Sequence, residues 1–409
     1  MKKIFTIMFN NSMAVYLFLI PCMILLGSAD LHCKPVRGIT DKTIEIGLIA
    51  DLTGPSAGDI GLLLLNGLTT YTKHINDGGG LFGRKVKFIT EDDRYSIPTA
   101  IAGFKKLLFK DQIFAFIGPG NAGAAKALCV QIEKQRVPTI SYSPDEFMVK
   151  PLKRYIFLPL PLYDDQLAVI FDYIVNDLRP KRTEITLVYH DAESGKIALA
   201  SAKKWAKYFN FQLSTEIIGL GALDATSQVM SIKRRKPTHI VMHHGSPGTA
   251  ALLRDLKKFS LDIPVYGTLP TCTEDMVKMA GSASKNYFGV HSFGSWHDDT
   301  QSVKMMRKIT LKYKPEIEKA PPSNIYTAAW TLATILYEGL MRTGKDPTIE
   351  GLITALESIR EFDTKGLSGP VNFSATNHKG ISYSKIHKAD PEEGRLIPIT
   401  DWRRPVSEE

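Results

Sequence analysis

Hydrophobic and polar positions along the chain follow two alternating patterns. Short apolar runs rich in β-branched residues, typical of buried strands, alternate with longer segments whose apolar residues recur at helical spacing. The expected strands form one series at 43–52, 84–92, 113–118 and 137–141 and another at 184–190, 212–218, 238–244 and 264–269. The expected helices cover 60–77, 98–111, 122–135, 164–178, 195–209, 225–236 and 248–259. This alternation predicts parallel sheets with helices on both faces.

Two such series in one chain predict an α/β protein with two Rossmann-like lobes. Three extended segments, 155–165, 287–296 and 363–374, are expected to cross between the lobes and to form a hinge. Helices are expected again at 299–313 and 323–344, and strands at 381–390 and 395–402. The predicted boundaries are 42–160 plus 295–366 for lobe 1, 161–294 plus 367–402 for lobe 2, and 403–409 for a tail. A ligand would then lie between the lobes.

The composition is that of an ordinary globular protein, with 409 residues, 44% hydrophobic and 23% charged. The formal net charge is +9, but the basic residues are scattered along the chain. The tightest basic run, 233–236, is expected at the end of a helix, where cations interact favourably with the helix dipole. Nucleic-acid binding is therefore not expected.

The first 29 residues have the features of a secretory signal peptide. Lys2 and Lys3 precede an apolar stretch at 13–26, and small residues follow it at Gly27 and Ala29. Cleavage is expected near Ala29, and it would release an exported, soluble protein. An uncleaved membrane anchor and lipid attachment remain alternatives.

Three cysteines would remain after cleavage: Cys33, Cys129 and Cys272. Three cysteines permit at most one disulfide bond, so the fold is not expected to depend on disulfides. Whether Cys129 and Cys272 are paired or free stays open.

A glycine-rich segment, 78–83, has the spacing G-x-G-x-x-G of dinucleotide-binding loops. Such a loop must follow a strand and open a helix, because the phosphates bind at the helix N-terminus. Here the order is reversed, since the expected helix at 60–77 comes before the glycines and the strand at 84–92 comes after them. We therefore interpret the segment as a helix cap and turn.

Catalytic and metal-binding patterns are not evident. His243 and His244 are adjacent in an expected strand, so their side chains should point to opposite faces of the sheet, and a polar pair near the cleft is favoured over a metal site. No combination of nucleophile, base and oxyanion site is apparent. We expect neither an enzyme nor a bound cofactor or metal.

The loops that follow the expected strands are the candidate ligand site, because α/β sheets bind ligands at the carboxyl ends of their strands. These loops are rich in Gly, Ser or Asn and comprise 54–61, 118–124 and 141–145 in lobe 1 and 190–195, 244–248 and 269–275 in lobe 2. Free backbone N–H groups at the starts of the following helices suit a carboxylate. A plain helix cap is the simpler interpretation of any single loop.

The segments 45–61 and 75–93 resemble the opening of the leucine/isoleucine/valine-binding family of type I periplasmic binding proteins. Later segments at 114–120, 137–143 and 325–330 fit the same pattern, and the resemblance extends over 42–402. It implies an extracytoplasmic solute-binding protein with two lobes and three crossings, located in the periplasm. It also implies a monomer that delivers an amino acid or related small carboxylate to the permease subunits of an ABC importer.

The resemblance also implies the binding residues, loop by loop. The expected ligand contacts are Ile60, Asn121, Ala122, Ser141, Tyr142, Ser143, Ser194, Ser246, Leu269 and Tyr326. The family usually has a serine where this chain has Asn121-Ala122, and an acidic residue for the ligand ammonium where this chain has Leu269. A non-amino-acid organic acid is therefore an alternative ligand, although Asp59 or Asp145 could supply the missing charge. A ligand-sensing receptor module is a further alternative.

Overall fold

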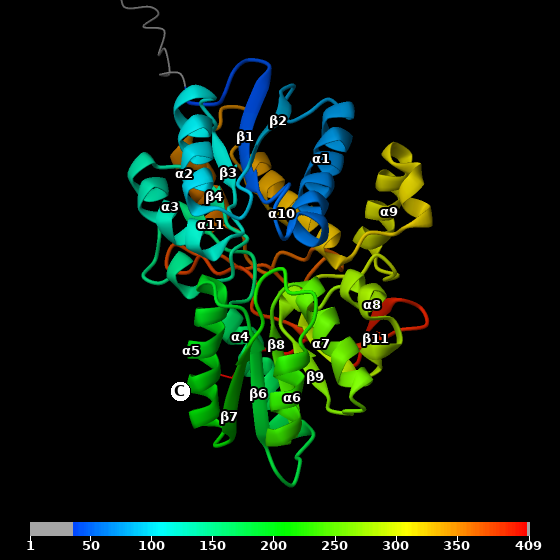
Figure 1. The fold of residues 1–409 in the computed structure, drawn as a ribbon. Coiled ribbons are helices and arrows are strands. Elements are labelled where there is room, and N and C mark those ends of the chain that lie inside the picture. Colours follow the sequence, from blue (N-terminus) through cyan, green and yellow to red (C-terminus); the bar gives the residue numbers. More distant parts are fainter. Residues whose placement is uncertain (1–35, 407–409) are drawn as a thin grey trace, which may run out of the picture. The chain divides into compact units, whose positions relative to one another are not determined.

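The computed structural model describes residues 36–406, which contain two sheets. The first sheet is parallel, with the strand order β2-β1-β3-β4-β5. Figure 1 labels β1 to β4 of this sheet. Its strands are β1 (Thr43–Ala50), β2 (Lys85–Asp92), β3 (Ala115–Ile117), β4 (Thr139–Ile140) and β5 (Ile156–Phe157). The signal peptide predicted at 1–29 and Cys33 lie outside the described residues.

The second sheet has seven strands in the order β12-β11-β10-β9-β8-β6-β7. The strands β6 to β10 are parallel, and β11 and β12 extend the sheet in an antiparallel arrangement. Its strands are β6 (Glu184–Tyr189), β7 (Gln212–Ile217), β8 (His239–His243), β9 (Val265–Gly267), β10 (Tyr287–His291), β11 (Lys385–Asp390) and β12 (Arg395–Pro398). The predicted fold class, an α/β protein with two Rossmann-like lobes, is confirmed.

Helices connect the strands in both sheets. They are α1 (Leu62–Asp77), α2 (Ile97–Lys105), α3 (Ala122–Gln135), α4 (Tyr163–Asp172), α5 (Glu193–Tyr208), α6 (Thr226–Arg235), α7 (Ser246–Lys258), α8 (Glu274–Ala280), α9 (Gln301–Tyr313), α10 (Asn324–Arg342) and α11 (Ile349–Glu357). A π-helical turn, Ala57–Gly61, leads into α1. None of the helices in residues 36–406 is long and apolar enough to cross a membrane.

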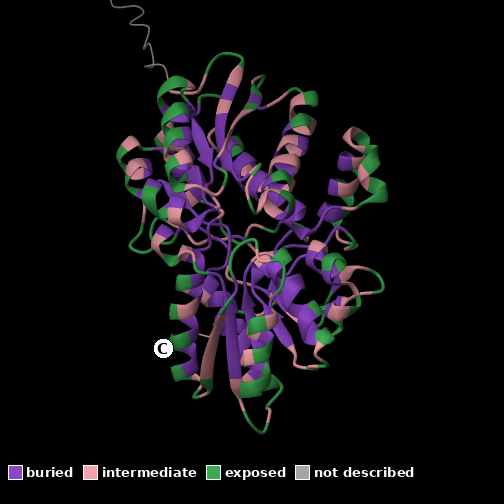
Figure 2. Ribbon diagram, in the orientation of Figure 1, coloured by how far each residue is buried: buried purple, intermediate pink, exposed green. Residues whose placement is uncertain are grey.

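Helices cover both faces of the second sheet because its central strands are apolar on both sides. On one face, Val188 and Met242 pack against residues of α6, α7 and α8. On the other face, Leu187 and Val241 pack against α4 and α5. These central strands are buried along their length (Figure 2). Alternation along each strand therefore places successive side chains in two separate cores.

The C-terminal half of the chain returns to the first lobe through α10, which packs against α1. The two helices approach closely at Gly67, where an added Cβ atom would lie 2.5 Å from the Cβ atom of Ala329. Trp330 is fully buried, and its ring meets that of Tyr71 edge to face with centroids 5.0 Å apart. Each large apolar side chain buried in this way contributes about 1.5–3 kcal/mol to folding.

The glycine-rich segment is a turn, as predicted. Helix α1 ends at Asp77, and Gly79, Gly80 and Gly83 have φ values of 110°, 81° and 83°. At Gly80 an added Cβ atom would lie 2.0 Å from the backbone oxygen of Arg84, so this position requires glycine. The segment reverses the chain between α1 and β2.

Two of the predicted crossings contain strands. Ile156–Phe157 pairs with β4 as the edge strand β5, and Tyr287–His291 forms β10 between β9 and β11. These strands were not predicted, because strands of two to five residues have too few positions to show a strand pattern of their own, and the crossings between the lobes stay a prediction. The helices α8 and α11 were also not predicted. The lobe boundaries stay a prediction.

Candidate functional site

A cavity of about 240 Å³ lies at the carboxyl ends of strands from both sheets. Residues from the first sheet's loops and from α10 line one side, and residues from the second sheet's loops line the other. Its polar lining residues include Asp51, Asp59, Asp93, Tyr95, Asn121, Tyr142, Tyr163, His190, Ser194, His243 and His244. Its apolar lining residues include Ile60, Leu64, Leu160, Leu220, Leu269, Phe293, Ile325, Ala328 and Leu332. A concave, mostly apolar site with a few polar groups is typical of small-molecule binding.

Asp51 organises the loop after β1. One carboxylate oxygen accepts a hydrogen bond from Gly54 N at 2.6 Å, and the other accepts from the backbone N and the hydroxyl of Ser56, both at 2.8 Å. At Gly61 an added Cβ atom would lie 1.6 Å from the backbone oxygen of Asp51, so only glycine fits there. These contacts hold the turn before α1 against the cavity.

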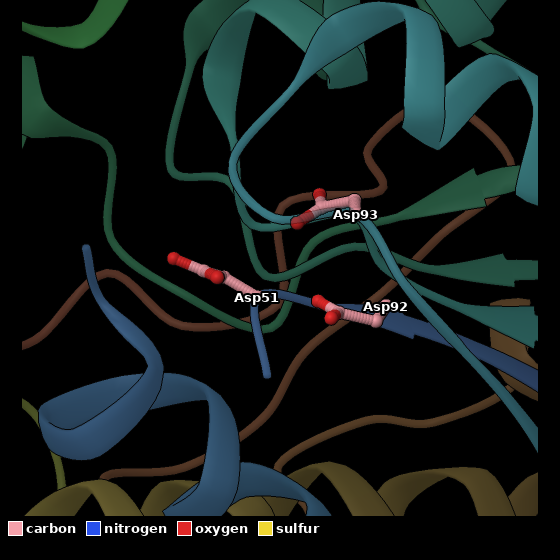
Figure 3. Close-up of side chains that lie close together, drawn as sticks. All are labelled: Asp51, Asp92 and Asp93. Carbon is pink, nitrogen blue, oxygen red and sulfur yellow. The ribbon is translucent and has the colours of Figure 1, made fainter. Parts of the chain in front are cut away.

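Asp51, Asp92 and Asp93 form an acidic cluster whose carboxylate oxygens lie within 4.8 Å of one another (Figure 3). Asp92 accepts hydrogen bonds from Leu52 N at 2.9 Å and from the hydroxyl of Thr53 at 2.6 Å. Burial, together with smaller contributions from the nearby carboxylates of Asp51 and Asp92, raises the pKa of Asp93 to about 6. Because Asp51 and Asp92 are occupied by loop contacts, their role is to fold the two neighbouring loops.

The N-terminus of α3 opens at the cavity. The side-chain oxygen of Asn121 accepts a hydrogen bond from Ala124 N at 3.2 Å, and its amide nitrogen donates to the Tyr95 backbone oxygen at 2.8 Å. The hydroxyl of Tyr142 donates to the Ile49 backbone oxygen at 2.7 Å. An added Cβ atom at Gly120 would lie 2.1 Å from the Tyr142 ring. Hydrogen bonds and close packing therefore fix the positions of Asn121 and Tyr142 beside the N-terminus of α3.

Three histidines lie at the second-lobe side of the cavity. His190 pairs with the hydroxyl of Ser194 at 3.1 Å, and His243 Nδ1 lies 2.9 Å from the hydroxyl of Thr268. His244 Nδ1 accepts from Gly245 N at 2.8 Å. Burial lowers the pKa of His190 to about 4 and holds the pKa values of His243 and His244 below their usual range. All three imidazoles are therefore neutral at pH 7.

The expectation that His243 and His244 point to opposite faces of a sheet assumed that both residues lie in one strand, and that assumption was wrong. Strand β8 ends at His243, and His244 lies in the bend that follows, so the strict alternation of a strand does not apply. Both residues line the cavity, as expected for a polar pair near the cleft.

Direct contacts connect the two lobes beside the cavity. Ser246 N, at the start of α7, donates to the carboxylate of Asp59 at 3.3 Å. Lys126 on α3 forms an ion pair with Glu193 on α5 at 2.6 Å. The loops of the two lobes are therefore close enough for one small molecule to contact both.

Comparison with known proteins identifies the family. A family model described as "Periplasmic binding protein" matches residues 43–394. The chain belongs to this family. The resemblance to the leucine/isoleucine/valine-binding type I group is confirmed by this match together with the fold of solved relatives.

Solved structures of binding proteins have the same fold at low sequence identity. A branched-chain amino acid ABC transporter protein from Thermus thermophilus with bound valine is 23% identical, with a TM-score of 0.82 over 90% of this chain and 97% of that chain. A fatty acid ABC transporter substrate-binding protein from Thermomonospora curvata is 22% identical, with a TM-score of 0.80 over 92% and 95%. A solute-binding protein from R. palustris in complex with benzoate is 20% identical, with a TM-score of 0.77 over 90% and 98%.

One curated relative has a different described role. The chemotactic signal transduction system substrate-binding protein BasB of Halobacterium salinarum is 22% identical over 335 residues, covering 78% of this chain and 75% of the relative. Proteins similar to this chain are therefore described in transport and in chemotaxis.

The residues predicted as ligand contacts in this periplasmic binding protein fall into two groups. Those that line the cavity are Ile60, Asn121, Tyr142, Ser194 and Leu269. Those that do not line it are Ala122, Ser141, Ser143, Ser246 and Tyr326.

The second group is buried behind the cavity wall. The hydroxyl of Ser143 donates to the carboxylate of Asp145, and Ser141 Oγ accepts from Ser143 N at 3.2 Å. The hydroxyl of Tyr326 pairs with that of Thr310 at 3.0 Å. Ser246 pairs with Thr273 at 2.9 Å through its hydroxyl. The hydrogen bonds of these hydroxyls stabilise the protein behind the cavity and leave the hydroxyls outside its lining.

Sequence reasoning missed several lining residues. Asp51, Asp93 and Tyr95 follow strands β1 and β2, so the position of a polar residue just after a strand was the available signal. Ile325, Ala328 and Leu332 come from one side of α10. The resemblance placed Tyr326 of this helix at the site, but it did not indicate which residues of the helix line the cavity.

Proposed function

We propose that the protein is an extracytoplasmic solute-binding protein that captures a small carboxylate-bearing solute, an amino acid or a related compound, and delivers it to an ABC importer. The observation that carries the proposal is the cavity of about 240 Å³ bordered by the strand ends of both sheets. Its size suits a small solute, and its position suits a ligand that both lobes contact. The protein would act as a monomer, in the periplasm, with the importer's permease subunits as partners and without catalysis.

The walls of the cavity suit an amphipathic solute. Leu64, Leu269 and Leu332 would contact its apolar part. Gly120 and Asn121, which line the cavity just before the N-terminus of α3, would receive its carboxylate, because a helix N-terminus has a partial positive charge. We keep Asn121 and Tyr142 as proposed ligand contacts, and we propose that Ser141 and Ser143 act by supporting the loop.

Closure around the ligand would couple binding to transport. A solute that contacts both lobes in the closed form and one lobe in the open form stabilises the closed form by the difference in its binding free energies. The contacts Asp59–Ser246 and Lys126–Glu193 would belong to the closed form. Import requires both capture and release, and a dissociation constant between about 1 nM and 1 μM meets both needs.

A thermal-shift screen of the chain from residue 30 onward tests the proposal. The screen uses amino acids, aromatic acids, short fatty acids and amides, and binding raises the melting temperature as the ligand concentration rises. We expect a saturable shift with a narrow class of solutes. The proposal fails if no small solute shifts the melting temperature while turnover of a substrate is detected.

A ligand-sensing role is the second candidate, and the described role of the curated relative BasB favours it. The two roles share the site and differ in the partner. Reconstitution with an ABC permease in liposomes distinguishes them: ligand uptake that depends on this protein supports transport, and ligand-dependent binding to a receptor without uptake supports sensing.

A further inference from the structure

Two short basic segments lie side by side in the second lobe. The first, 179–182, comes before β6, and the second, 233–236, includes the end of α6 and comes before β8. Strands β6 and β8 are parallel neighbours, and Arg182 Nη2 donates a hydrogen bond to the backbone oxygen of Lys236 at 3.0 Å. The two segments carry seven exposed cations, which we call the basic edge: Arg179, Lys181, Arg182, Lys233, Arg234, Arg235 and Lys236.

Most of the charges of the basic edge have no carboxylate partner. Arg182 pairs with Glu184 at 3.5 Å, and Arg235 pairs with Glu216. The other five cations form no ion pair within residues 36–406. Seven cations and two carboxylates leave a net charge of +5 on two adjacent loops.

Helix dipoles offset only a small part of this charge. Helix α6 ends at Arg235, and its C-terminal partial charge of about −0.5 favours cations there. The π-helical turn that continues α4 ends at Asp177, and Asp177 is itself paired with Arg403 at 2.6 Å. The two helix ends together offset about one unit of charge. The remaining positive charge attracts an anionic partner.

Exposed apolar side chains lie beside these cations. Leu178, directly before the first segment, is 45% exposed, and Tyr208, at the end of α5, is 50% exposed. The chain that follows α5 reaches the first segment, where Gln212 N donates to the Thr183 backbone oxygen at 3.4 Å. Cations mixed with apolar and aromatic side chains suit a lipid surface, because its anionic headgroups cover an apolar layer. The phosphate backbone of a nucleic acid offers an exposed leucine no such layer.

The basic edge and the cavity lie at opposite ends of the same strands. The cavity is bordered by His190 and His244, which follow β6 and β8, whereas the basic edge precedes both strands. Strand β6 has six residues, and a rise of about 3.3 Å per residue separates its two ends by about 20 Å. A partner bound at the basic edge therefore leaves the cavity open to its solute.

We propose that the basic edge is a docking surface for an anionic lipid membrane, with its lysines and arginines paired with the headgroup phosphates. This inference goes beyond the proposed function and takes from it only that the protein works beside a membrane. Docking would hold the protein near the membrane that contains its transport partner. The contacts are electrostatic, so they should weaken as the salt concentration rises.

Vesicle sedimentation tests the inference with the chain from residue 30 onward. The vesicles are pure phosphatidylcholine or phosphatidylcholine with about 30% phosphatidylglycerol. We expect binding to the anionic vesicles at about 0.05 M salt, at least about 10-fold weaker binding to the neutral ones, and loss of binding at about 0.5 M salt. Equal binding to both kinds of vesicle, or no binding to the anionic ones, overturns the inference and leaves the proposed function standing.

The triple variant Lys233→Gln/Arg234→Gln/Lys236→Gln assigns the binding to the basic edge. It keeps Arg235, so the ion pair with Glu216 remains. Each cation near an anionic surface strengthens binding about fivefold, so the variant should bind the anionic vesicles about 100-fold more weakly than wild type. Binding as tight as that of wild type would overturn the assignment.

A matched control removes the same charge from the first lobe. The variant Lys105→Gln/Lys110→Gln/Lys134→Gln replaces three exposed lysines on α2, on the turn after it and on α3. It should keep its affinity for the anionic vesicles to within about threefold, because only cations within about a Debye length of the surface contribute to binding. Equal losses in the two triple variants contradict the assignment, because they would indicate an effect of net charge alone.

Two further titrations complete the test. Tighter binding of a DNA duplex than of the anionic vesicles at the same salt concentration would overturn the choice of a lipid partner. The triple variant of the basic edge should bind solutes from the thermal-shift screen as tightly as wild type does, since its substitutions lie about 20 Å from the cavity. If no solute binds to either protein, the proposed function fails while the vesicle result stands.

Discussion

Asp145 should lower the stability of the protein as the pH rises, and replacing it with asparagine should remove that effect. Its side chain is fully buried, one oxygen accepts a hydrogen bond from the hydroxyl of Ser143, and the other has no partner within residues 36–406. Burial raises its pKa from 3.8 to about 6, Ser143 opposes the shift, and Glu193 and Lys126 have smaller, opposite effects. The folded protein therefore holds this proton more tightly than the unfolded chain does.

The magnitude follows from the shift. Below about pH 4 both states are protonated, and this group leaves the free energy of unfolding unchanged. Between pH 4 and 6 the unfolded chain has lost the proton and the folded protein has kept it, so the free energy of unfolding falls by about 1.4 kcal/mol per pH unit. Over a rise of roughly two units, the loss is about 3 kcal/mol by pH 7. Asp145→Asn cannot titrate, so it lacks this loss.

The assay is urea unfolding of wild type and Asp145→Asn between pH 3.5 and 7.5, followed by tryptophan fluorescence and far-UV circular dichroism. The constant effect of the amide cancels when the two curves are compared as a function of pH. We expect the stability of the variant relative to wild type to rise by about 3 kcal/mol between pH 4 and 7. Asp401→Asn, at an exposed site, is the control and should show no such rise. A pH-independent difference for Asp145→Asn would refute the reasoning.

Three further predictions concern other parts of the fold. In Gly120→Ala the new methyl group would lie 2.1 Å from the Tyr142 ring, so the ring must move. The affinity for the ligand, measured by calorimetry, should fall by at least about 10-fold, and an unchanged affinity would place the ligand elsewhere. Arg403→Ala removes the ion pairs of Arg403 with Asp172 at 2.7 Å and with Asp177 at 2.6 Å. It should lower the free energy of unfolding by about 1 kcal/mol and the melting temperature by roughly 1–2 °C. A fall in melting temperature of more than about 5 °C would show a larger structural role for Arg403. The free thiols of Cys129 and Cys272 are buried and have raised pKa values. A variant in which these two are the only cysteines should therefore react with a thiol reagent only after it is unfolded in urea. Rapid reaction of the folded variant would contradict the burial of the two thiols.

The sequence predicted the fold well because strand and helix periodicities are local. Each long strand, such as β1 or β6, has enough residues to show its pattern, and each is followed by a recognisable helix. The two-residue strand β5 could not be recognised, because its assignment depends on pairing with β4, a distant contact.

The site was predicted only in part, because side-chain direction depends on tertiary contacts. The loops at the strand ends were found from position alone, and Asn121 and Tyr142 do line the cavity. Ser141 and Ser143 were expected there from their loop, but their hydroxyls bond within it. The contribution of Ile325 required knowing that α10 packs beside α1.

The central claim, that one small solute binds between the lobes, is tested most directly by a crystal structure with the tightest solute from the thermal-shift screen. We predict one ligand per chain in the cavity, with its apolar part against Leu64 and Leu269 and with contacts to residues of both lobes. A ligand bound outside this cavity, or contacting one lobe alone in a closed protein, would contradict the account.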